Sequence, residues 1–179
     1  WTNQTSGTTE HLNDIQFFNN LSGIIVGTSG TVLKTIDGGD KWTSINTIID
    51  EDINALSFIN SQEGWVATYG GLIYKSTDGA VSWIQQDPGV SEYWFSGICF
   101  TDSQHGCVVG VSGTIILTGN GGSMWAPKSL LNNFSLESVC FVDENNGWAV
   151  GSEFTSDYNV ILKTVNGGNT WTAQSIPDA

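Results

Sequence analysis

A short sequence motif, which we call the phrase, combines an acidic or amide side chain, glycines and a tryptophan and occurs four times in the sequence. The four copies read TIDGGDKW, STDGAVSW, TGNGGSMW and TVNGGNTW. A carboxylate beside glycines and an aromatic ring can bind a cation, or act as a general acid or base next to a bound sugar. Two copies carry Asn in place of Asp, however, and an amide can neither ionise nor exchange a proton in these roles.

The chemistry of a tight turn accounts for every constant position of the phrase, [S/T]-x-[D/N]-x-G-x-x-W. The Asp or Asn side chain can accept hydrogen bonds from backbone N–H groups of its own turn. Glycine permits a positive φ without steric cost, and the Trp ring can be buried beneath the hairpin. We therefore interpret the phrase as a structural turn that holds no metal and no cofactor. Its members are Asp37, Trp42, Asp78, Trp83, Asn120, Trp125, Asn166 and Trp171.

Charge excludes several classes of partner. The chain has 18 acidic residues and 5 basic ones, all of them lysines, and a net charge of -13. Binding to nucleic acid phosphates needs clustered Lys and Arg, so we expect no nucleic-acid partner. No stretch approaches 18 consecutive apolar residues, so we expect no membrane span.

The other candidate catalytic or metal-binding groups are few. Asp52, Glu92 and Asp157 can be proposed as glycosidase carboxylates, but in so acidic a chain we interpret them as solvated surface groups. Cys99, Cys107 and Cys140 fit no zinc-binding spacing. Each cysteine lies in an apolar run, which predicts small buried side chains, and a Cys99–Cys107 disulfide across one hairpin stays open. The sequence therefore predicts a protein that is not an enzyme.

The elements that position these residues repeat along the chain. Trp1 and the four phrase tryptophans follow one another at intervals of 41, 41, 42 and 46 residues. A fixed period of this size indicates stacked supersecondary units. Each unit begins with a run of alternating apolar and polar residues, which is typical of a β-strand.

Four short strands are expected in every unit. The first strands are expected at 13–18, 54–59, 96–101 and 137–142. The second strands are expected at 23–27, 64–68, 106–110 and 147–151, and the third at 31–35, 71–76, 114–118 and 160–164. The fourth strands begin on the phrase tryptophans, at 42–46, 83–87, 125–129 and 171–175. Strands joined by such short turns pair with their sequence neighbours. The sequence predicts an all-β protein, a β-propeller-type array of four four-stranded antiparallel blades.

The phrase resembles the Asp-box, or BNR repeat, and four copies in register cover almost the whole chain. The fuller pattern, GWAVG followed by ILKT and NGGNTW, is similar to the propellers related to the photosystem II stability and assembly factor. This resemblance implies a propeller, commonly of six to eight blades, in which the Asp-box turns face away from the usual active site. From it we carry over the fold and a binding character, but not a photosynthetic role. The Asp-box resemblance also includes sialidases, but their arginine cluster has no counterpart here because the chain lacks Arg.

We expect a single domain over 1–179, with repeats at approximately 6–46, 47–87, 88–129 and 130–176. Residues 1–5 read like a fourth strand although the last repeat already has its own. We therefore expect 1–5 to be a surplus outer strand, and the chain to be part of a larger or oligomeric propeller. Open blade edges would then allow self-association.

Residues that differ between repeats are the candidates for function. The connections opposite the Asp-box turns bring aromatic residues and carboxylates to one face, which suits protein or glycan recognition. The candidate binding residues are Tyr69, Tyr93, Trp94, Phe134, Phe154, Asp157 and Tyr158.

The sequence thus predicts a non-enzymatic binding or scaffolding module that recognises a protein or a glycan. Family resemblance to exported proteins of bacteria leads us to expect an extracellular or bacterial cell-surface location, with the signal outside this chain. Two alternatives remain open. One is a glycoside hydrolase propeller fragment, and the other is a structural subunit of a surface assembly.

Overall fold

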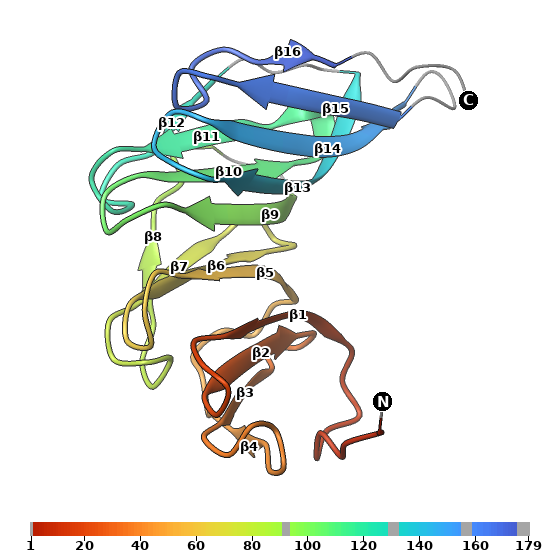
Figure 1. Ribbon diagram of the computed structural model, residues 1–179, viewed down its shortest axis with the longest axis vertical. Helices are drawn as coiled ribbons and strands as arrows, with labels where there is room; N and C mark the ends of the chain where they lie inside the picture. The colour runs from red at the N-terminus through yellow and green to blue at the C-terminus, as the bar shows by residue number, and fades with distance from the viewer. Residues whose placement is uncertain (1, 91–93, 129–132, 155–158, 175–179) are drawn as a thin grey trace.

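The described residues form four antiparallel sheets (Figure 1). The computed structural model describes residues 2–90, 94–128, 133–154 and 159–174. Each sheet contains four strands that are consecutive in the sequence and paired in sequence order. The predicted all-β array of four-stranded antiparallel blades is therefore confirmed. We number these sheets blade 1 to blade 4 along the chain.

The strands are short, and the outer strand of each blade is the shortest. Blade 1 contains β1 (Leu12–Phe17), β2 (Gly23–Gly27), β3 (Val32–Thr35) and β4 (Thr43–Ser44). Blade 2 contains β5 (Ile53–Phe58), β6 (Gly64–Thr68), β7 (Ile73–Ser76) and β8 (Ile84–Gln86). Blade 3 contains β9 (Phe95–Phe100), β10 (Gly106–Gly110), β11 (Ile115–Thr118) and β12 (Ala126–Pro127), with a 3-10 turn at Val111–Gly113. Blade 4 contains β13 (Phe134–Phe141), β14 (Gly147–Glu153), β15 (Asn159–Thr164) and β16 (Thr172–Ala173).

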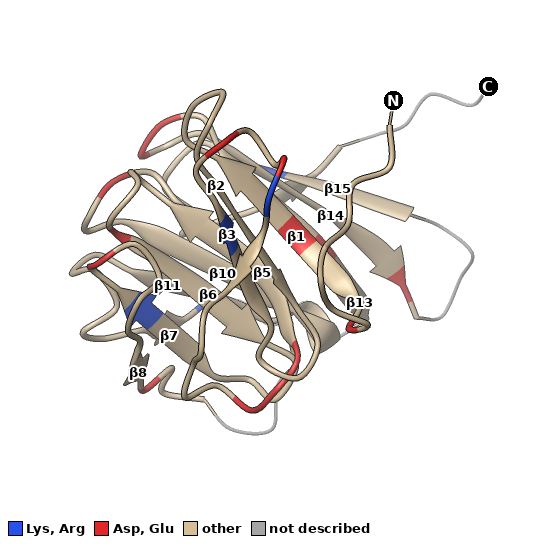
Figure 2. Ribbon diagram, turned by 90° about the horizontal axis from the view of Figure 1, so that it is seen from below, with Lys and Arg blue, Asp and Glu red and all other residues tan. Residues whose placement is uncertain are grey.

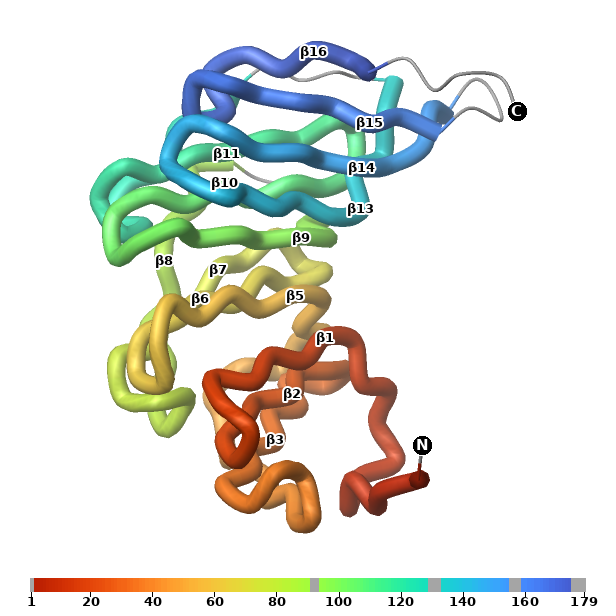
Figure 3. The backbone as a smooth tube through the Cα atoms, viewed as in Figure 1, coloured from red at the N-terminus to blue at the C-terminus, as the bar shows by residue number. Residues whose placement is uncertain are grey.

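The blades follow one another in chain order along the long axis of the molecule, and blades 1 and 4 lie at opposite ends (Figures 1 and 3). The inner strands β1, β5, β9 and β13 are in contact in succession. Every hydrophobic core lies between two consecutive blades. The first core, for example, joins Ile24 and Val26 of blade 1 to Leu56 and Phe58 of blade 2.

Hydrogen bonds from side chains of one inner strand to the backbone of the next hold the blades in register. Gln16 accepts a bond from the Phe58 N–H at 2.8 Å and donates one to the Phe58 carbonyl at 2.8 Å. One blade on, the Ser57 hydroxyl accepts a bond from the Phe100 N–H at 2.9 Å. The Cys99 thiol is placed in the same way and accepts one from the Phe141 N–H at 3.2 Å.

Cys140 occupies the corresponding position in blade 4 and is exposed. The expectation that all three cysteines are buried is therefore wrong for Cys140, because no blade among the described residues packs beyond it. Cys107 is buried and Cys99 is half-buried. The structure contains no disulfide between them, although they face each other across β9 and β10.

Residues 2–5 belong to no strand. Gln4 nevertheless lies against Gly39 of the blade 1 turn, as Gln86 of blade 2 lies against Gly122 of the blade 3 turn. Gly39 and Gly122 hold the same position in their turns, and β8, which ends at Gln86, is the outer strand of blade 2. We therefore retain as a proposal that 1–5 take the place of an outer strand preceding blade 1, and that the repeats divide as stated above.

The Asp-box turns repeat one set of hydrogen bonds among their hydroxyl, Asp or Asn and backbone groups in all four blades. In each turn the Ser or Thr hydroxyl donates to the Asp or Asn Oδ1 at 2.8 to 3.0 Å. The same Oδ1 accepts a backbone N–H four residues later at 2.9 to 3.0 Å. The same Ser or Thr hydroxyl accepts a hydrogen bond at 2.9 Å from the backbone N–H of the residue two positions after the Asp or Asn. That residue has positive φ and is Gly39, Ala80, Gly122 or Gly168.

Each Asp-box tryptophan meets the phenylalanine that ends the inner strand of its own blade. The four pairs are edge-to-face, with ring centroids 5.8 to 6.1 Å apart and interplanar angles of 84° to 89°. This is a favourable arrangement for aromatic quadrupoles. Trp83 and Trp125 are also buried against the preceding blade, so the turn contributes to the packing between blades.

We predict that the amide found naturally in blades 3 and 4 can replace the carboxylate in blade 2. Asp78→Asn should stay within about 0.5 kcal/mol of the wild-type free energy of unfolding, because Asn retains the Oδ1 acceptor. Asp78→Ala removes the acceptor of bonds from Ser76 and Ser82 and should cost about 1 kcal/mol. Urea denaturation at pH 7 measures the free energy of unfolding of both variants. Equal losses in the two variants would contradict the role of Oδ1 as the hydrogen-bond acceptor of the turn.

The pH dependence of the same variants gives a second measurement. Bonds from the Ser82 hydroxyl and backbone N–H lower the pKa of Asp78 to about 2. The ionised carboxylate therefore stabilises the fold above the unfolded-state pKa of about 4, and this contribution is lost as the pH falls toward about 2. The wild type should lose more stability than Asp78→Asn across this interval.

Candidate functional site

The face opposite the Asp-box turns is formed by two sets of connections, and we call it the loop face. One set joins the second strand of a blade to its third, and the other joins the fourth strand to the next blade. Backbone hydrogen bonds tie the two sets together, for example from Gly30 N–H to the Glu51 carbonyl at 2.7 Å. The loop face is therefore supported by the blades beneath it.

Two predicted binding residues from different blades meet on the loop face. The rings of Tyr69 and Trp94 are stacked, with centroids 4.8 Å apart and an interplanar angle of 17°. Tyr69 follows β6 in blade 2 and Trp94 precedes β9 in blade 3. The two side chains are 47% and 49% exposed, so the stack presents aromatic surface to solvent.

The backbone on both sides of the stack is fixed. The Tyr69 N–H donates to the Asp52 carbonyl at 2.8 Å, and the Trp94 carbonyl accepts a bond from the Val111 N–H at 3.1 Å. Phe95, next to Trp94, is fully buried in the core between blades 2 and 3. The stack thus rests on a rigid part of the scaffold.

Carboxylates with defined hydrogen-bond partners lie on the same face. The Thr68 hydroxyl donates to Glu51 Oε2 at 2.8 Å, and the Ser29 N–H donates to Asp52 Oδ1 at 2.9 Å. Glu10 Oε2 accepts the Thr28 hydroxyl at 2.6 Å. These bonds hold the carboxylates in place. Glu51 flanks the stack, because its carboxylate contacts Thr68 and lies against Gly70, on either side of Tyr69.

Positive charge is sparse, and only Lys128 lies on a connection of the loop face. The five lysines lie on the third strands, in an Asp-box turn or just after β12: Lys34, Lys41, Lys75, Lys128 and Lys163. Figure 2 shows red acidic segments on many loops and few blue ones. Glu10, Asp52 and Glu51 on this face are hydrogen-bonded to hydroxyl or backbone N–H groups and not to a lysine, which favours a cationic or hydrogen-bond-donating partner.

The remaining predicted residues are placed differently. Phe134 begins β13 and packs partly against the core between blades 3 and 4. Phe154 is 59% exposed, and its N–H donates to the Asn133 carbonyl at 2.7 Å. Neither of these two rings stacks on the Tyr69–Trp94 pair. Tyr93, Asp157 and Tyr158 lie outside the described residues, as does Glu92, one of the three candidate glycosidase carboxylates.

No group of three or more His, Cys, Asp or Glu side chains within the described ranges could hold a metal ion. Helices long and apolar enough to cross a bilayer are also absent from those ranges.

Comparison with known proteins identifies the family. The family model described as photosynthesis system II assembly factor YCF48 matches the chain twice in tandem, at residues 1–89 and 90–178. The protein belongs to this family. The predicted resemblance to Asp-box propellers of the photosystem II assembly-factor type is therefore confirmed.

One curated relative is much longer than this chain. The photosystem II stability/assembly factor HCF136, chloroplastic, from Oryza sativa subsp. japonica is 32% identical over 93 residues, covering 48% of this chain and 20% of the rice protein. The chain thus spans about a fifth of the curated relative it matches.

Solved structures confirm the propeller fold. A structure titled "YCF48 bound to D1 peptide" aligns with a TM-score of 0.60 and 18% identity, covering 93% of this chain and 81% of that one. The GH74 enzyme of Niastella koreensis aligns with a TM-score of 0.75 and 17% identity, covering 90% and 30%. An ancestral GH74 enzyme gives a TM-score of 0.76 with 19% identity, covering 99% and 26%. At these identities the likeness shows the fold alone.

Family membership corrects the expected location. An extracellular or bacterial cell-surface location is contradicted, because the family is described by a photosystem II assembly factor and the rice relative is chloroplastic. The expectation relied on exported bacterial members of the family and set its photosynthetic role aside.

Sequence reasoning overlooked a second repeated turn, between the first and second strands of each blade. Its Asn or Asp side chain accepts the backbone N–H groups two and three residues later, at 2.6 to 2.9 Å. The four residues are Asn19, Asn60, Asp102 and Asp143. Their spacing of 41, 42 and 41 residues was a signal available in the sequence.

We predict that Trp94 contributes little to stability, in contrast to a core tryptophan. Trp94→Ala should lower the free energy of unfolding by about 1 kcal/mol, since it loses mainly one half-exposed stacking contact. Trp65 is fully buried and stacked on Phe100, so Trp65→Ala should cost about 3–5 kcal/mol. Urea denaturation compares them, and equal losses would show that Trp94 belongs to the core.

Proposed function

We propose that this protein is a non-enzymatic binding and scaffolding propeller that recognises a segment of a partner protein through its loop face. The stacked, half-exposed pair of Tyr69 and Trp94 beside fixed carboxylates carries the proposal. Exposed aromatic surface of this kind is enriched in recognition sites and is unusual elsewhere on a soluble surface. Tyr93, Asp157 and Tyr158 remain candidate contributors to the same face.

The chemistry of the face favours a segment that carries Lys or Arg. Glu51 and Asp52 would attract a cationic side chain, and the neighbouring aromatic faces would bind an ammonium or guanidinium group. The structure titled "YCF48 bound to D1 peptide" supports a protein segment as the type of ligand, because that protein belongs to the same family.

A glycan is the alternative ligand, because sugars also stack on aromatic rings. The GH74 neighbours share the fold, and they raise the alternative that the chain hydrolyses polysaccharides. We favour protein binding because the family described above is that of an assembly factor. A polysaccharide panel tests both glycan binding and hydrolysis.

We predict that a short peptide rich in Lys and Arg binds with an affinity that falls as the salt concentration rises. Trp94→Ala and Tyr69→Ala should each weaken binding about tenfold, a loss of about 1.4 kcal/mol. Fluorescence anisotropy of a labelled peptide at 50 mM and 300 mM NaCl measures both effects.

Met124→Ala is a matched control, because Met124 is 71% exposed in an Asp-box turn on the opposite face. An uncharged peptide of equal length controls for non-specific contact. Equal binding of both peptides, or no loss in either aromatic variant, would contradict the proposal. Turnover of any polysaccharide would instead support the hydrolase alternative.

We further propose that the chain self-associates through the open faces of its end blades. Ile15 is 53% exposed in blade 1, whereas Leu56, Ile98 and Val139 at the same position in the other blades are 6%, 6% and 7% exposed. Val150 is 43% exposed in blade 4, whereas Val26, Ala67 and Val109 at the same position in the other blades are fully buried. These two faces are the counterparts of surfaces that are buried between blades elsewhere in the chain.

Sedimentation equilibrium should therefore give a mass above that of one chain at micromolar concentration. Ile15→Asp should shift the mass toward a monomer, since it places a charge on the apolar face of blade 1. Ser44→Asp, on the exposed outer strand β4, is the matched control. A stable monomer of the wild type across the concentration range would rule out self-association.

A further inference from the structure

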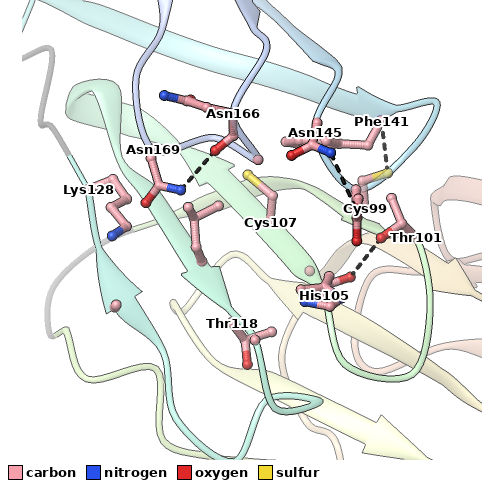
Figure 4. A pocket seen from close by; sticks show the side chains of 16 residues that line it. Cys99, Thr101, His105, Cys107, Thr118, Lys128, Phe141, Asn145, Asn166 and Asn169 are labelled. Carbon is pink, nitrogen blue, oxygen red and sulfur yellow. Dashed lines mark hydrogen bonds between the residues drawn. The ribbon is translucent and has the colours of Figure 1, made fainter.

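A cavity of about 450 Å³ lies between blades 3 and 4, on the Asp-box side of the molecule (Figure 4). Its lining includes Cys107 of β10, Leu117 of β11 and Phe141 at the end of β13. Gly167 of the blade 4 turn and Lys128, just after β12, also line it. The cavity is separate from the loop face, which is at the other end of the strands.

The space between blades 2 and 3 shows what can fill this place, whereas Ile24 holds the position between blades 1 and 2. Between blades 2 and 3 the equivalent space is occupied by the indole of Trp65, which is fully buried. The indole is stacked on Phe100, with centroids 3.6 Å apart and an interplanar angle of 5°. Its Nε1–H donates to the carbonyl of Gly121 at 3.2 Å.

Cys107 holds the position of Trp65 in blade 3. Trp65 follows Gly64 at the start of β6, and Cys107 follows Gly106 at the start of β10. The partners of the indole are nevertheless retained one blade further on, because Phe141 corresponds to Phe100 and Gly167 corresponds to Gly121. A cysteine side chain is much smaller than an indole, so its presence leaves the space open.

The other side chains around the cavity do not replace the missing ring. Leu117 stands at the position of Lys75, whose ammonium lies 4.6 Å from the centroid of the Trp65 ring. In the turns of blades 2 and 3 the first Gly carbonyl accepts side-chain donors, from Lys34 at Gly79 and from Trp65 and Gln86 at Gly121. Among the described residues, no recorded side-chain donor reaches the Gly167 carbonyl.

The floor of the cavity is apolar. Burial raises the pKa of both Cys99 and Cys107, so each sulfur is a neutral thiol at pH 7. Phe141 and Leu117 add carbon surface beside them. Polar groups line the remainder, including Asn145 and Asn169. This combination suits a flat apolar ring that carries one hydrogen-bond donor.

We infer that this cavity is a binding site for an indole ring, presented as a tryptophan side chain by a partner protein. The ring stacks on Phe141, and its N–H donates to the carbonyl of Gly167, in the arrangement that Trp65 adopts between blades 2 and 3. The volume is sufficient, since an apolar protein cavity of about 150 Å³ already binds benzene. Lys128 and the two asparagines then contact the partner's backbone at the entrance.

Titration of the wild-type protein with free indole tests the inference without any variant. Isothermal titration calorimetry should show saturable binding at one site per chain. 1-Methylindole lacks the N–H donor and should bind about fivefold more weakly, the effect of one lost hydrogen bond. N-acetyltryptophanamide, which carries the peptide groups of a tryptophan residue, should also bind and should compete with indole.

Two reciprocal variants localise the site. Cys107→Trp supplies the missing ring from within the chain, and should abolish indole binding and raise the thermal unfolding midpoint. Trp65→Cys creates the same cavity between blades 2 and 3, and should raise the stoichiometry to two. Circular dichroism confirms that each variant is folded, and the wild-type titration remains decisive if either is not.

Three results would overturn the inference: no saturable indole binding, equal binding of indole and 1-methylindole, or unchanged binding in folded Cys107→Trp. Trp94→Ala removes the aromatic stack of the loop face and should leave indole binding unchanged. Failure of the peptide experiment on the loop face is thus distinguishable from failure of this one.

Discussion

A four-stranded blade has two faces and no hydrophobic core of its own, and the rest of this structure depends on that constraint. Each apolar face is buried only where another blade covers it, so the same sequence position has different surroundings in different blades. Leu56 and Ile98 are buried between blades, whereas Ile15 at the same position is half-exposed at the end of the series. Packing between neighbours therefore provides most of the stability, as expected for repeat proteins.

The Asp-box turns support this packing, and the Oδ1 of each Asp or Asn side chain already accepts two hydrogen bonds within its own turn. The Oδ1 of Asp37, for example, accepts both the Thr35 hydroxyl and the Lys41 N–H, and the pKa of Asp37 is lowered by these bonds. The identical geometry around Asn120 shows that the turn needs an oxygen acceptor rather than a charge. Function is thus expected where the repeats differ, which is also where a change does not disturb the shared scaffold.

Periodicity made the fold predictable, because period-two alternation and the turn phrase each recur at a constant interval. The site was only partly predictable. Tyr69 and Trp94 could be assigned to one face from the order of strands, but their stacking depends on how blades 2 and 3 are placed side by side. The exposure of Cys140 and the cavity at Cys107 depend on the neighbouring blade in the same way. The local sequence pattern around a residue does not show which side chains of the neighbouring blade pack against it.

The two candidate sites differ in chemistry and lie at opposite ends of the strands. The loop face offers aromatic rings beside carboxylates. The cavity between blades 3 and 4 is uncharged at its floor, and the Gly167 carbonyl at its lining accepts no side-chain donor among the described residues. If both proposals hold, a partner bound at one site would not block the other, and a single chain would contact two segments at once. Neither site requires a chemical step from the protein. Rigid blades that hold two segments at a fixed separation are suited to scaffolding, and this agrees with membership of an assembly-factor family.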